Sequence, residues 1–514
     1  MVLIGIVHDG VAQKQDSIIY SINIVRDNVF PGDKSELSGI QRFTNSMHPL
    51  TKERVIQREL LFQVGDTLDM QLMAETERSL RTFRFLGSAD VSIDTVLNDS
   101  VSIVVHTADQ WTLLPSPIIE SGGGLNGFGV SIEDSNFLGR GKTIYLKAFN
   151  ESDIGTSYTA AVYDPRFFGT RWKSALGLNT GPVRDAVVLA IHKPYFSSDS
   201  KWTYGVSGLY NNEIQRQFVN GQEFSRSGYK RRLSEAFVGY AYGKRYNKKR
   251  VKLQYRYESR DYIDLGDQTN TEIPEDELIA ATTISYSIEK ESFVKEFQID
   301  NFLRKEDIVL GRKTLFSLGK AGFPVPVGKD HWELEIDHKS TLKLNNDNYL
   351  YINPLLTSWM SRNTIAEMVA QYYWQTTEYM TLAFNAEFTY AWNLDLNRQF
   401  VLGGNSGLRG YQARAFGGDK RFVANLESRL FPKIKFLTLA LGGVAFVDGG
   451  FAWERDVSMD FKNLKYSAGV GLRIGLTKFP GAGVLRVDVG WPIDQPGGPQ
   501  LTLGTDQHFI AFRK

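Results

Sequence analysis

The stretch Arg250-Val251-Lys252-Leu253-Gln254-Tyr255-Arg256-Tyr257-Glu258 alternates strictly between polar and apolar side chains. Successive side chains of a β-strand point to opposite faces, so this stretch would have one charged face and one apolar face. Similar alternation occurs at Tyr379–Trp392, Tyr466–Leu476 and Leu485–Trp491. From about residue 111 to the end, this period of two predicts strands and hairpins, and helical periodicity is absent.

Alternation alone leaves two architectures open, a soluble β-sandwich and a transmembrane β-barrel. Three features favour the barrel. The apolar segments are about nine to eleven residues long, which is the length that a tilted spanning strand needs. Aromatic residues such as Trp392, Trp453 and Trp491 lie at strand ends, as in interfacial girdles. The polar faces carry charges, which suits a water-filled interior.

Length and composition limit the class of protein further. The chain has 514 residues and a formal net charge of +1, whereas a nucleic-acid binder normally has a basic face. It contains no cysteine, which excludes disulfides and thiolate metal sites. It has no run of about 18 apolar residues, so the sequence predicts no transmembrane helix.

Residues 17–110 follow a mixed pattern that predicts a separate α+β module. The polar stretch containing Pro31 and Gly32 is expected to be an inserted loop. The module's expected order is β-α-α-β-β. The predicted elements are a strand at Ile18–Val25, a helix from Thr51, a helix over about 69–83, and strands at Ala89–Thr95 and Val101–Thr107.

Residues 1–12 resemble the back half of a secretory signal peptide. An apolar run, Met1–Val7, precedes a small-residue cleavage site after Ala12. The positive segment that normally comes before the apolar run is missing. The alternative interpretation is an apolar N-terminus without a targeting role.

Motifs that would indicate catalysis are incomplete. Phe137–Thr143 has the tail of a phosphate-binding loop, but Asn136 occupies the position of its first glycine and a strand pattern follows. The nucleophile motif G-x-S-x-G does not occur. The seven histidines show no metal-ligand spacing. The sequence therefore predicts no enzymatic activity, no cofactor and no metal site.

One arginine lies in a glycine-rich loop, within Leu408-Arg409-Gly410-Tyr411. Taken alone, Arg409 would be an ordinary surface-loop arginine. Alternation, however, places the carboxylates of Asp448 and Glu427 on the inward faces of their strands. Within a barrel, the planar guanidinium of Arg409 could bind these carboxylates and hold the loop inside the lumen.

From about residue 18 to the end, the chain resembles the bacterial outer-membrane assembly barrels of the BamA/TamA-type surface-antigen, or outer-membrane-protein-85, superfamily. The resemblance implies one POTRA (polypeptide-transport-associated) module at residues 17–110 and an antiparallel barrel of sixteen strands at residues 111–514. It also implies that Arg409, Gly410 and Tyr411 form a loop-locking motif received by Asp448. The motifs that carry it are Arg54–Asp66, Asn136–Gly141, Tyr163–Phe167, Lys193–Phe196, Leu408–Tyr411 and Phe446–Gly450.

The resemblance implies a protein that assists the insertion or translocation of polypeptides at the bacterial outer membrane, with its POTRA module in the periplasm. Its partners would be unfolded outer-membrane protein clients, outer-membrane lipids and periplasmic or lipoprotein accessory factors, and no nucleic acid. Three alternatives stay open: a two-partner-type secretion pore for one exported protein, a passive or lipid-handling pore, and a structural adhesin barrel.

An insertase needs an edge that can open, because a closed barrel exposes none. The first barrel strand is expected near Thr112–Ser121, where two prolines remove backbone donors. Its partner is expected at Leu501–Phe512, and the opened edge would template an incoming strand by β-augmentation. The residues assigned to this lateral seam are Pro115, Pro117, Phe509 and Phe512.

Overall fold

The computed structural model describes residues 17–32, 35, 37–244, 247–265, 273–297, 299, 305–328, 330–360, 362–436, 439–476, 484–505 and 507–509. The proposed signal-peptide remnant at residues 1–12, and Phe512, lie outside these ranges. The chain divides into two compact units. The first consists of residues 1–116, 131–146 and 160–175, and the second of residues 117–130, 147–159 and 176–514.

The first unit contains an N-terminal α+β module. Its three-stranded sheet has the order β1-β3-β2, with β1 parallel to β3 and β2 antiparallel to it. Within the described ranges, none of the helices has the length and hydropathy that crossing a bilayer requires. The elements are β1 (Ile18–Asp27), α1 (Gly39–Met47), α2 (Glu53–Gln57), α3 (Met70–Arg81), β2 (Leu86–Leu97) and β3 (Ser100–Asp109).

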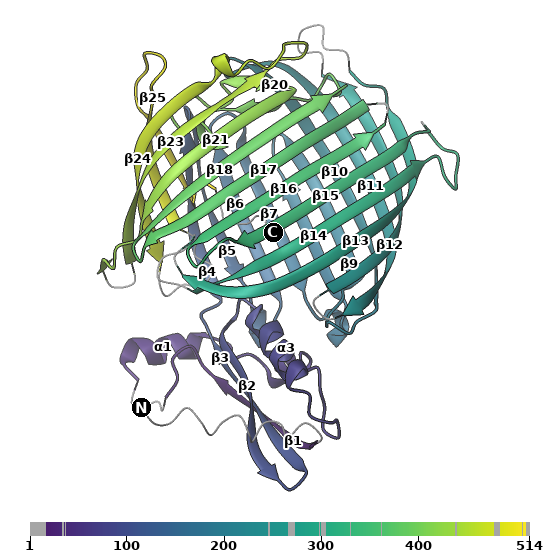
Figure 1. Cartoon of the computed structure of the whole chain (residues 1–514), viewed down its shortest axis with the longest axis vertical. Coiled ribbons are helices and arrows are strands. Elements are labelled where there is room, and N and C mark those ends of the chain that lie inside the picture. The colour runs from purple at the N-terminus through teal and green to yellow at the C-terminus, as the bar shows by residue number, and fades with distance from the viewer. Residues whose placement is uncertain are drawn as a thin grey trace. The chain divides into compact units, whose positions relative to one another are not determined.

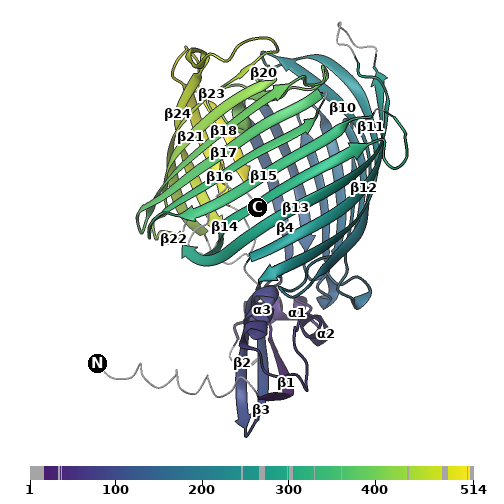
Figure 2. The same ribbon diagram turned by 45° about the vertical axis from the view of Figure 1, so that its right-hand side comes forward.

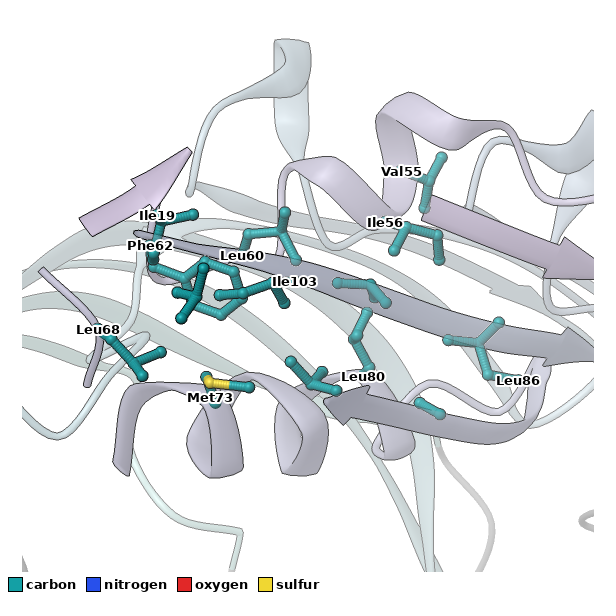
Figure 3. Close-up of a cluster of buried hydrophobic side chains, with 14 of the residues drawn as sticks. Ile19, Val55, Ile56, Leu60, Phe62, Leu68, Met73, Leu80, Leu86 and Ile103 are labelled. Atoms are coloured by element: carbon teal, nitrogen blue, oxygen red, sulfur yellow. The ribbon is translucent and has the colours of Figure 1, made fainter. Parts of the chain in front are cut away.

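The core of this module lies between its sheet and its helices. Ile103 projects from the central strand β3, and Met73 and Leu80 project from α3 toward it (Figure 3). Val55 and Ile56 of α2 are buried in the same cluster. The i,i+3 and i,i+4 spacing of apolar residues in the helices therefore forms the face that covers the sheet.

The helix α1 lies where sequence analysis expected an inserted loop. Its N-cap is Ser38, whose side chain accepts a hydrogen bond from the Gln41 backbone N–H. In return, the Gln41 side chain accepts one from the Ser38 backbone N–H. This reciprocal arrangement is a capping box, which starts a helix without any buried apolar face. The module therefore has three helices among its described residues, not the expected two.

The remaining strands form a closed antiparallel barrel, which confirms the predicted mainly β class. Among the described residues the barrel has twenty strands, with the two-residue β22 as an extra piece beside β23. The expected number of sixteen was therefore wrong. It came from the resemblance, and alternation locates strands without counting them. The long strands β10 to β14 slant side by side in Figures 1 and 2.

The strands of the barrel, and a small separate ribbon made of β19 and β20, have the following bounds: β4 (Leu113–Gly122), β5 (Leu125–Asp134), β6 (Thr143–Glu151), β7 (Gly155–Asp164), β8 (Lys173–Thr180), β9 (Arg184–Lys193), β10 (Trp202–Val219), β11 (Gln222–Lys244), β12 (Asn247–Asp264), β13 (Glu277–Phe297), β14 (Lys305–Ala321), β15 (Trp332–Lys343), β16 (Asn348–Trp359), β17 (Arg362–Thr377), β18 (Met380–Trp392), β19 (Phe400–Leu402), β20 (Phe416–Gly418), β21 (Lys420–Leu430), β22 (Lys435–Phe436), β23 (Leu439–Trp453), β24 (Lys465–Leu476), β25 (Val484–Pro492) and β26 (Gln500–Thr505).

The alternating stretch Arg250–Glu258 lies in β12. Its apolar side chains Val251, Leu253 and Tyr257 are exposed on the outer face. On the opposite face Glu258 is buried and accepts a hydrogen bond from Arg231 Nε at 2.8 Å. The period of two therefore separates an apolar exterior from an ion-paired interior, as expected for a barrel that faces lipid. The strands β10 to β14 have 17 to 23 residues, which is longer than the nine to eleven that were predicted.

Candidate functional site

The loop between β18 and β21, residues 393–419, has a buried tip. Leu408 and Arg409 are both 0 % exposed. Gly403 and Gly407 have φ of 139° and 132°, which side-chain-bearing residues rarely adopt. A Cβ at Gly403 would also lie 2.1 Å from the carbonyl oxygen of Gln412. The chain can therefore fold back on itself here only because glycine occupies these positions.

The Arg409 guanidinium binds three carboxylates. Its Nε and Nη2 donate to Oδ2 and Oδ1 of Asp448 at 2.9 and 2.7 Å. Its Nη1 donates to Oε1 of Glu427 at 2.7 Å and to Oδ2 of Asp488 at 3.0 Å. The guanidinium carbon also lies 3.5 Å from the centroid of the Phe446 ring. A planar fork makes this set of contacts possible, whereas lysine offers a single point charge.

The three carboxylates converge because they lie on the inward faces of nearby strands. Glu427 is on β21, Asp448 is on β23, and these two strands pair directly. Asp488 is on β25, which is separated from β23 by β24. Every second residue of β23 from Ala440 to Ala452 is buried, so Asp448 faces inward by register alone.

The structure brings together Arg409, Asp448 and Glu427, which sequence analysis had singled out. Asp488 was not predicted as a partner of Arg409, although it lies on the polar face of the alternating segment Leu485–Trp491. The available signal was an acidic residue facing inward on a strand close to β23. Alternation gives the face of a residue but not its height in the barrel, so it could not show that Asp488 meets the loop.

Three further arginines surround these groups. Arg429 Nε donates to Oε2 of Glu427 at 2.9 Å. Arg473 bonds Asp488, and Arg486 Nη1 donates to Oδ2 of Asp488 at 3.2 Å. We define the lumenal charge cluster by its members, which comprise one more cation than anion: Arg409, Arg429, Arg473, Arg486, Glu427, Asp448 and Asp488.

The lumenal charge cluster is buried, whereas sequence analysis expected a water-filled interior. The side chains of Arg409, Glu427 and Asp448 are 0 % exposed. Arginine stays charged in proteins, so the three buried carboxylates have a permanent cation to bind.

The two residues after Arg409 also fit closely. A Cβ at Gly410 would lie 2.6 Å from Ser467 Cβ and 2.8 Å from the carbonyl carbon of Trp491. The hydroxyl of Tyr411 donates to Oδ1 of Asp494, and its ring packs in a cluster with Leu408. The Arg409-Gly410-Tyr411 segment is thus held by charge, by shape and by apolar packing together.

A second arginine, Arg414, fixes the same loop near its outer part. Its Nη1 donates to Oδ2 of Asp153 at 2.7 Å, and its guanidinium carbon lies 4.3 Å from the centroid of the Phe218 ring. The side chain of Arg414 is 21 % exposed. This ion pair is more accessible to water than the Arg409 contacts, so we expect it to contribute less.

The lateral seam lies between the first barrel strand, β4, and the last, β26, and few of its described residues pair. β4 contains Pro115 and Pro117, and it pairs with β26 through one described register pair, Leu503 with Ser121. By comparison, β25 and β26 share six register pairs. The last strand also ends at Thr505, well before the expected residue 512.

Phe509 does not lie along the seam, so its predicted place there was wrong. It is 3 % exposed and packs in an interior cluster that includes Tyr373 and Ile299. Its carbonyl oxygen accepts a hydrogen bond from Arg429 Nη2 at 2.8 Å. The neighbouring Gln507 accepts one from Arg473 Nε at 2.9 Å. The segment after β26 leaves the sheet because these interior arginines bind its polar groups.

Two turns of the first unit share one conformation. In each turn an aspartate, Asp134 or Asp164, accepts a hydrogen bond from the backbone N–H two residues later. In the first turn this later residue is Asn136, whose Nδ2 donates to Oγ1 of Thr51 at 2.8 Å. In the second turn it is Arg166, which forms an ion pair with Glu59. Thr51 and Glu59 flank the helix α2 (Glu53–Gln57), so the paired turns hold the two ends of this helix.

Glu59 is nearly fully buried in this contact. Burial raises its pKa above the ordinary value of 4.5, and the attraction of Arg166 opposes the rise without cancelling it. Oε1 of Glu59 has no hydrogen-bond partner among the described residues. The ion pair is therefore a point of specific attachment, not a strong source of stability.

Comparison with known proteins adds a family match. Residues 342–509 match the Omp85 superfamily domain. No curated protein sequence matches the chain. The similar solved structures include BamA from Haemophilus ducreyi lacking POTRA domains 1-3 (14 % identity, 95 % of this chain and 85 % of that chain, TM-score 0.43), CdiB from Acinetobacter baumannii (12 %, 96 % and 74 %, TM-score 0.46) and CdiB from Escherichia coli (12 %, 96 % and 77 %, TM-score 0.48).

Proposed function

We propose a function from the premise that residues 342–509 are a domain of the Omp85 superfamily, which confirms the resemblance drawn from the sequence motifs. An outer-membrane location follows from this barrel fold. The proposed function is assistance in the insertion of polypeptides into that membrane, by opening the seam between β4 and β26. The N-terminal module would be a POTRA-type module in the periplasm.

The observation that carries this proposal is the sparse pairing of β26 with β4 among the described residues. One described register pair joins β26 to β4, and two prolines of β4 provide no backbone donor. A strand pair of a barrel resists separation through its ladder hydrogen bonds, so a strand that lacks donors separates from its neighbour more readily. An opened β4 edge would offer unpaired backbone groups to an unfolded client strand.

The alternative of a secretion pore has less support. Such a pore needs a clear lumen, whereas the loop tip at Arg409 and the segment 507–509 both occupy the interior. A passive or lipid-handling pore would also need a clear lumen, so the same two segments argue against it. Accessory factors and client identity stay proposals that the resemblance suggests.

A disulfide across the seam tests the proposal, since the native chain has no cysteine. Ser121→Cys with Leu503→Cys replaces the register pair that joins the two strands. Val489→Cys with Leu501→Cys is a matched control, because it crosslinks β26 to its well-paired neighbour β25. Both proteins would be placed in lipid vesicles and assayed for the folding of a denatured outer-membrane barrel added to them.

We expect the oxidised seam variant to lose most of its activity and to recover it when the disulfide is reduced. The oxidised control should stay active. Full activity of the crosslinked seam variant would rule out lateral opening. Depletion in cells separates the alternatives, because loss of an insertase lowers many outer-membrane proteins, while loss of a secretion pore removes one exported partner.

A further inference from the structure

The helix α1 (Gly39–Met47) presents its apolar face outward. Ile40, Phe43 and Met47 are 80, 67 and 59 % exposed, and none of the nine residues of the helix is buried. At about 100° per residue, these three side chains fall within one narrow sector of the helix. A helix that covers a protein core shows the opposite arrangement, with such residues buried.

The polar side of α1 attaches it to the protein. Asn45, on the side opposite the apolar sector, accepts a hydrogen bond from the Phe30 backbone N–H at 3.1 Å and donates to the Phe30 carbonyl oxygen at 2.9 Å. The capping box of Ser38 and Gln41 fixes the start of the helix. His48, just after its end, is buried and its Nε2 lies 2.9 Å from Oδ2 of Asp109. The exposed apolar face is therefore held in place at both ends of the helix.

The end of α1 lies close to the start of a barrel strand within the same compact unit. Asp109, the contact of His48, precedes the first residue of β4, Leu113, by four residues. Four residues reach at most about 14 Å. The His48 ring also lies 6.3 Å from the ring of Trp111, on this same connection.

The chemistry around this point fits a phospholipid surface. The Lys52 backbone N–H donates to the carbonyl oxygen of Gly139, in the turn between β5 and β6. Arg54 and Arg140 lie exposed beside these two residues and could meet lipid phosphates. The turn also exposes Leu138, and the equivalent turn exposes Phe168, at 50 and 88 %.

The backbone of these two turn residues supports the same conclusion. Leu138 and Phe168 have φ of 55° and 50°, a conformation that disfavours bulky side chains. Each turn therefore combines a strained residue with an exposed apolar side chain at the same position. Both features are unfavourable in water, and a lipid surface would relieve the exposure of the apolar group.

We propose that α1 is an interfacial anchor, which lays Ile40, Phe43 and Met47 onto the surface of a phospholipid bilayer. Short amphipathic helices bury such faces at the boundary between headgroups and acyl chains. This contact would continue the lipid interface of the barrel onto the N-terminal module. It would limit how far that module can move from the membrane. The inference rests on the membrane-spanning barrel and not on the insertase activity.

Single cysteine labels on the full chain test this proposal. Phe43→Cys carries an environment-sensitive fluorophore on the apolar face of α1. Asp90→Cys, exposed on β2, is the aqueous reference, and Leu426→Cys, exposed on the outer face of β21, is the lipid reference. The proteins would be measured in nanodiscs that hold one chain each, made of phosphatidylethanolamine and phosphatidylglycerol.

We expect the label at position 43 to emit at shorter wavelength than the label at position 90. We also expect lipids with nitroxide-bearing acyl chains to quench it several-fold more strongly, and aqueous iodide to quench it less. A label at position 43 that behaves like the one at position 90 overturns the proposal. A blue shift that appears only when discs hold two chains also overturns it, since a second copy would then cover the face.

The lipid reference separates two kinds of failure. If the label at position 426 is not quenched by the lipid nitroxides, the membrane-barrel premise itself is wrong. If position 426 is quenched and position 43 is not, only the role of α1 is wrong. Ile40→Ser together with Met47→Ser, which changes exposed side chains alone, should reduce the lipid quenching at position 43 and leave that at position 426 unchanged.

Discussion

Replacing Arg409 by alanine should release the loop tip while the barrel stays folded. The change does not affect all three carboxylates equally. Glu427 keeps its bond from Arg429, and Asp488 keeps Arg473 and Arg486. Among the described residues, Asp448 loses its one bonded cation. It keeps hydrogen bonds from Asn425 Nδ2 at 2.9 Å and, while the loop stays closed, from the backbone N–H of residue 409 at 3.2 Å. The change therefore leaves one buried carboxylate unpaired.

An uncompensated buried charge of this kind costs about 3–5 kcal/mol. The full range applies because Arg409 and Asp448 are both 0 % exposed, so water does not screen the pair. A factor of ten in an equilibrium corresponds to about 1.4 kcal/mol. The equilibrium for opening of the loop should therefore rise by roughly two to three and a half orders of magnitude. Arg409→Lys should keep the loop closed more often than Arg409→Ala does, since the lysine ammonium retains the positive charge. It should not match wild type, because lysine lacks the planar fork that binds both oxygens of a carboxylate.

Hydrogen exchange of residues 403–416 in the intact barrel measures this opening directly. Arg414→Ala is a matched control on the same loop. Its ion pair with Asp153 is partly exposed, so we expect a loss of about 1 kcal/mol or less. Heat-modifiable gel mobility checks that each variant keeps its barrel. Unchanged exchange in Arg409→Ala, or equal effects of Arg409→Ala and Arg414→Ala, would refute the argument that the buried fork holds the loop.

Two further substitutions have expected outcomes. Gly410→Ala should destabilise the closed loop by about 1–3 kcal/mol, because the new methyl group meets Ser467 and the backbone of Trp491. Gly498→Ala is the control, because a methyl group there has open space and should leave the stability of the loop unchanged. Hydrogen exchange of the loop compares the two variants. Glu59→Gln should remove a pH dependence. The folded-state pKa of Glu59 is raised, so its contribution is fully present below its unfolded pKa, near 4.5, and is lost as pH rises through the folded value. The stability of wild type relative to Glu59→Gln, followed by thermal unfolding, should therefore fall as pH rises from 4.5; a flat difference would contradict the burial argument.

Alternation in the sequence determined much of the fold, because the period of two fixes which side of a strand each residue faces. From the sequence alone, alternation places Asp448 and Glu427 on inward faces, and the glycines around Arg409 indicate a tightly folded loop. It could not give the stagger between strands. For that reason Asp488 and Arg473, although on the correct faces, were not recognised as neighbours of Arg409.

Two other differences have local causes. The helix α1 was not predicted, because its apolar residues face outward and do not form the buried periodic face that indicates a helix. The Ser38-x-x-Gln41 spacing, which is typical of a capping box, could have indicated its start. The last strand was expected to continue to residue 512 because its composition is suited to a strand. Interior contacts with Arg429 and Arg473 override that local preference at residues 507–509, and no local pattern in the sequence reports such long-range contacts.

The barrel could open in two ways, by clearing its lumen or by parting β4 from β26, and the contacts that each opening breaks bear on the proposed function. Clearing the lumen for a passing chain would break the Arg409–Asp448 pair, at about 3–5 kcal/mol, before the contacts of Phe509 and Arg414 are counted. Parting β26 from β4 breaks one register pair among the described residues, and Pro115 and Pro117 of β4 provide no backbone donor. Among the described residues, the sideways opening therefore breaks fewer contacts than clearing the interior does. An incoming strand that pairs with β4 would then replace the few bonds that were lost, which favours lateral insertion over passage through the barrel.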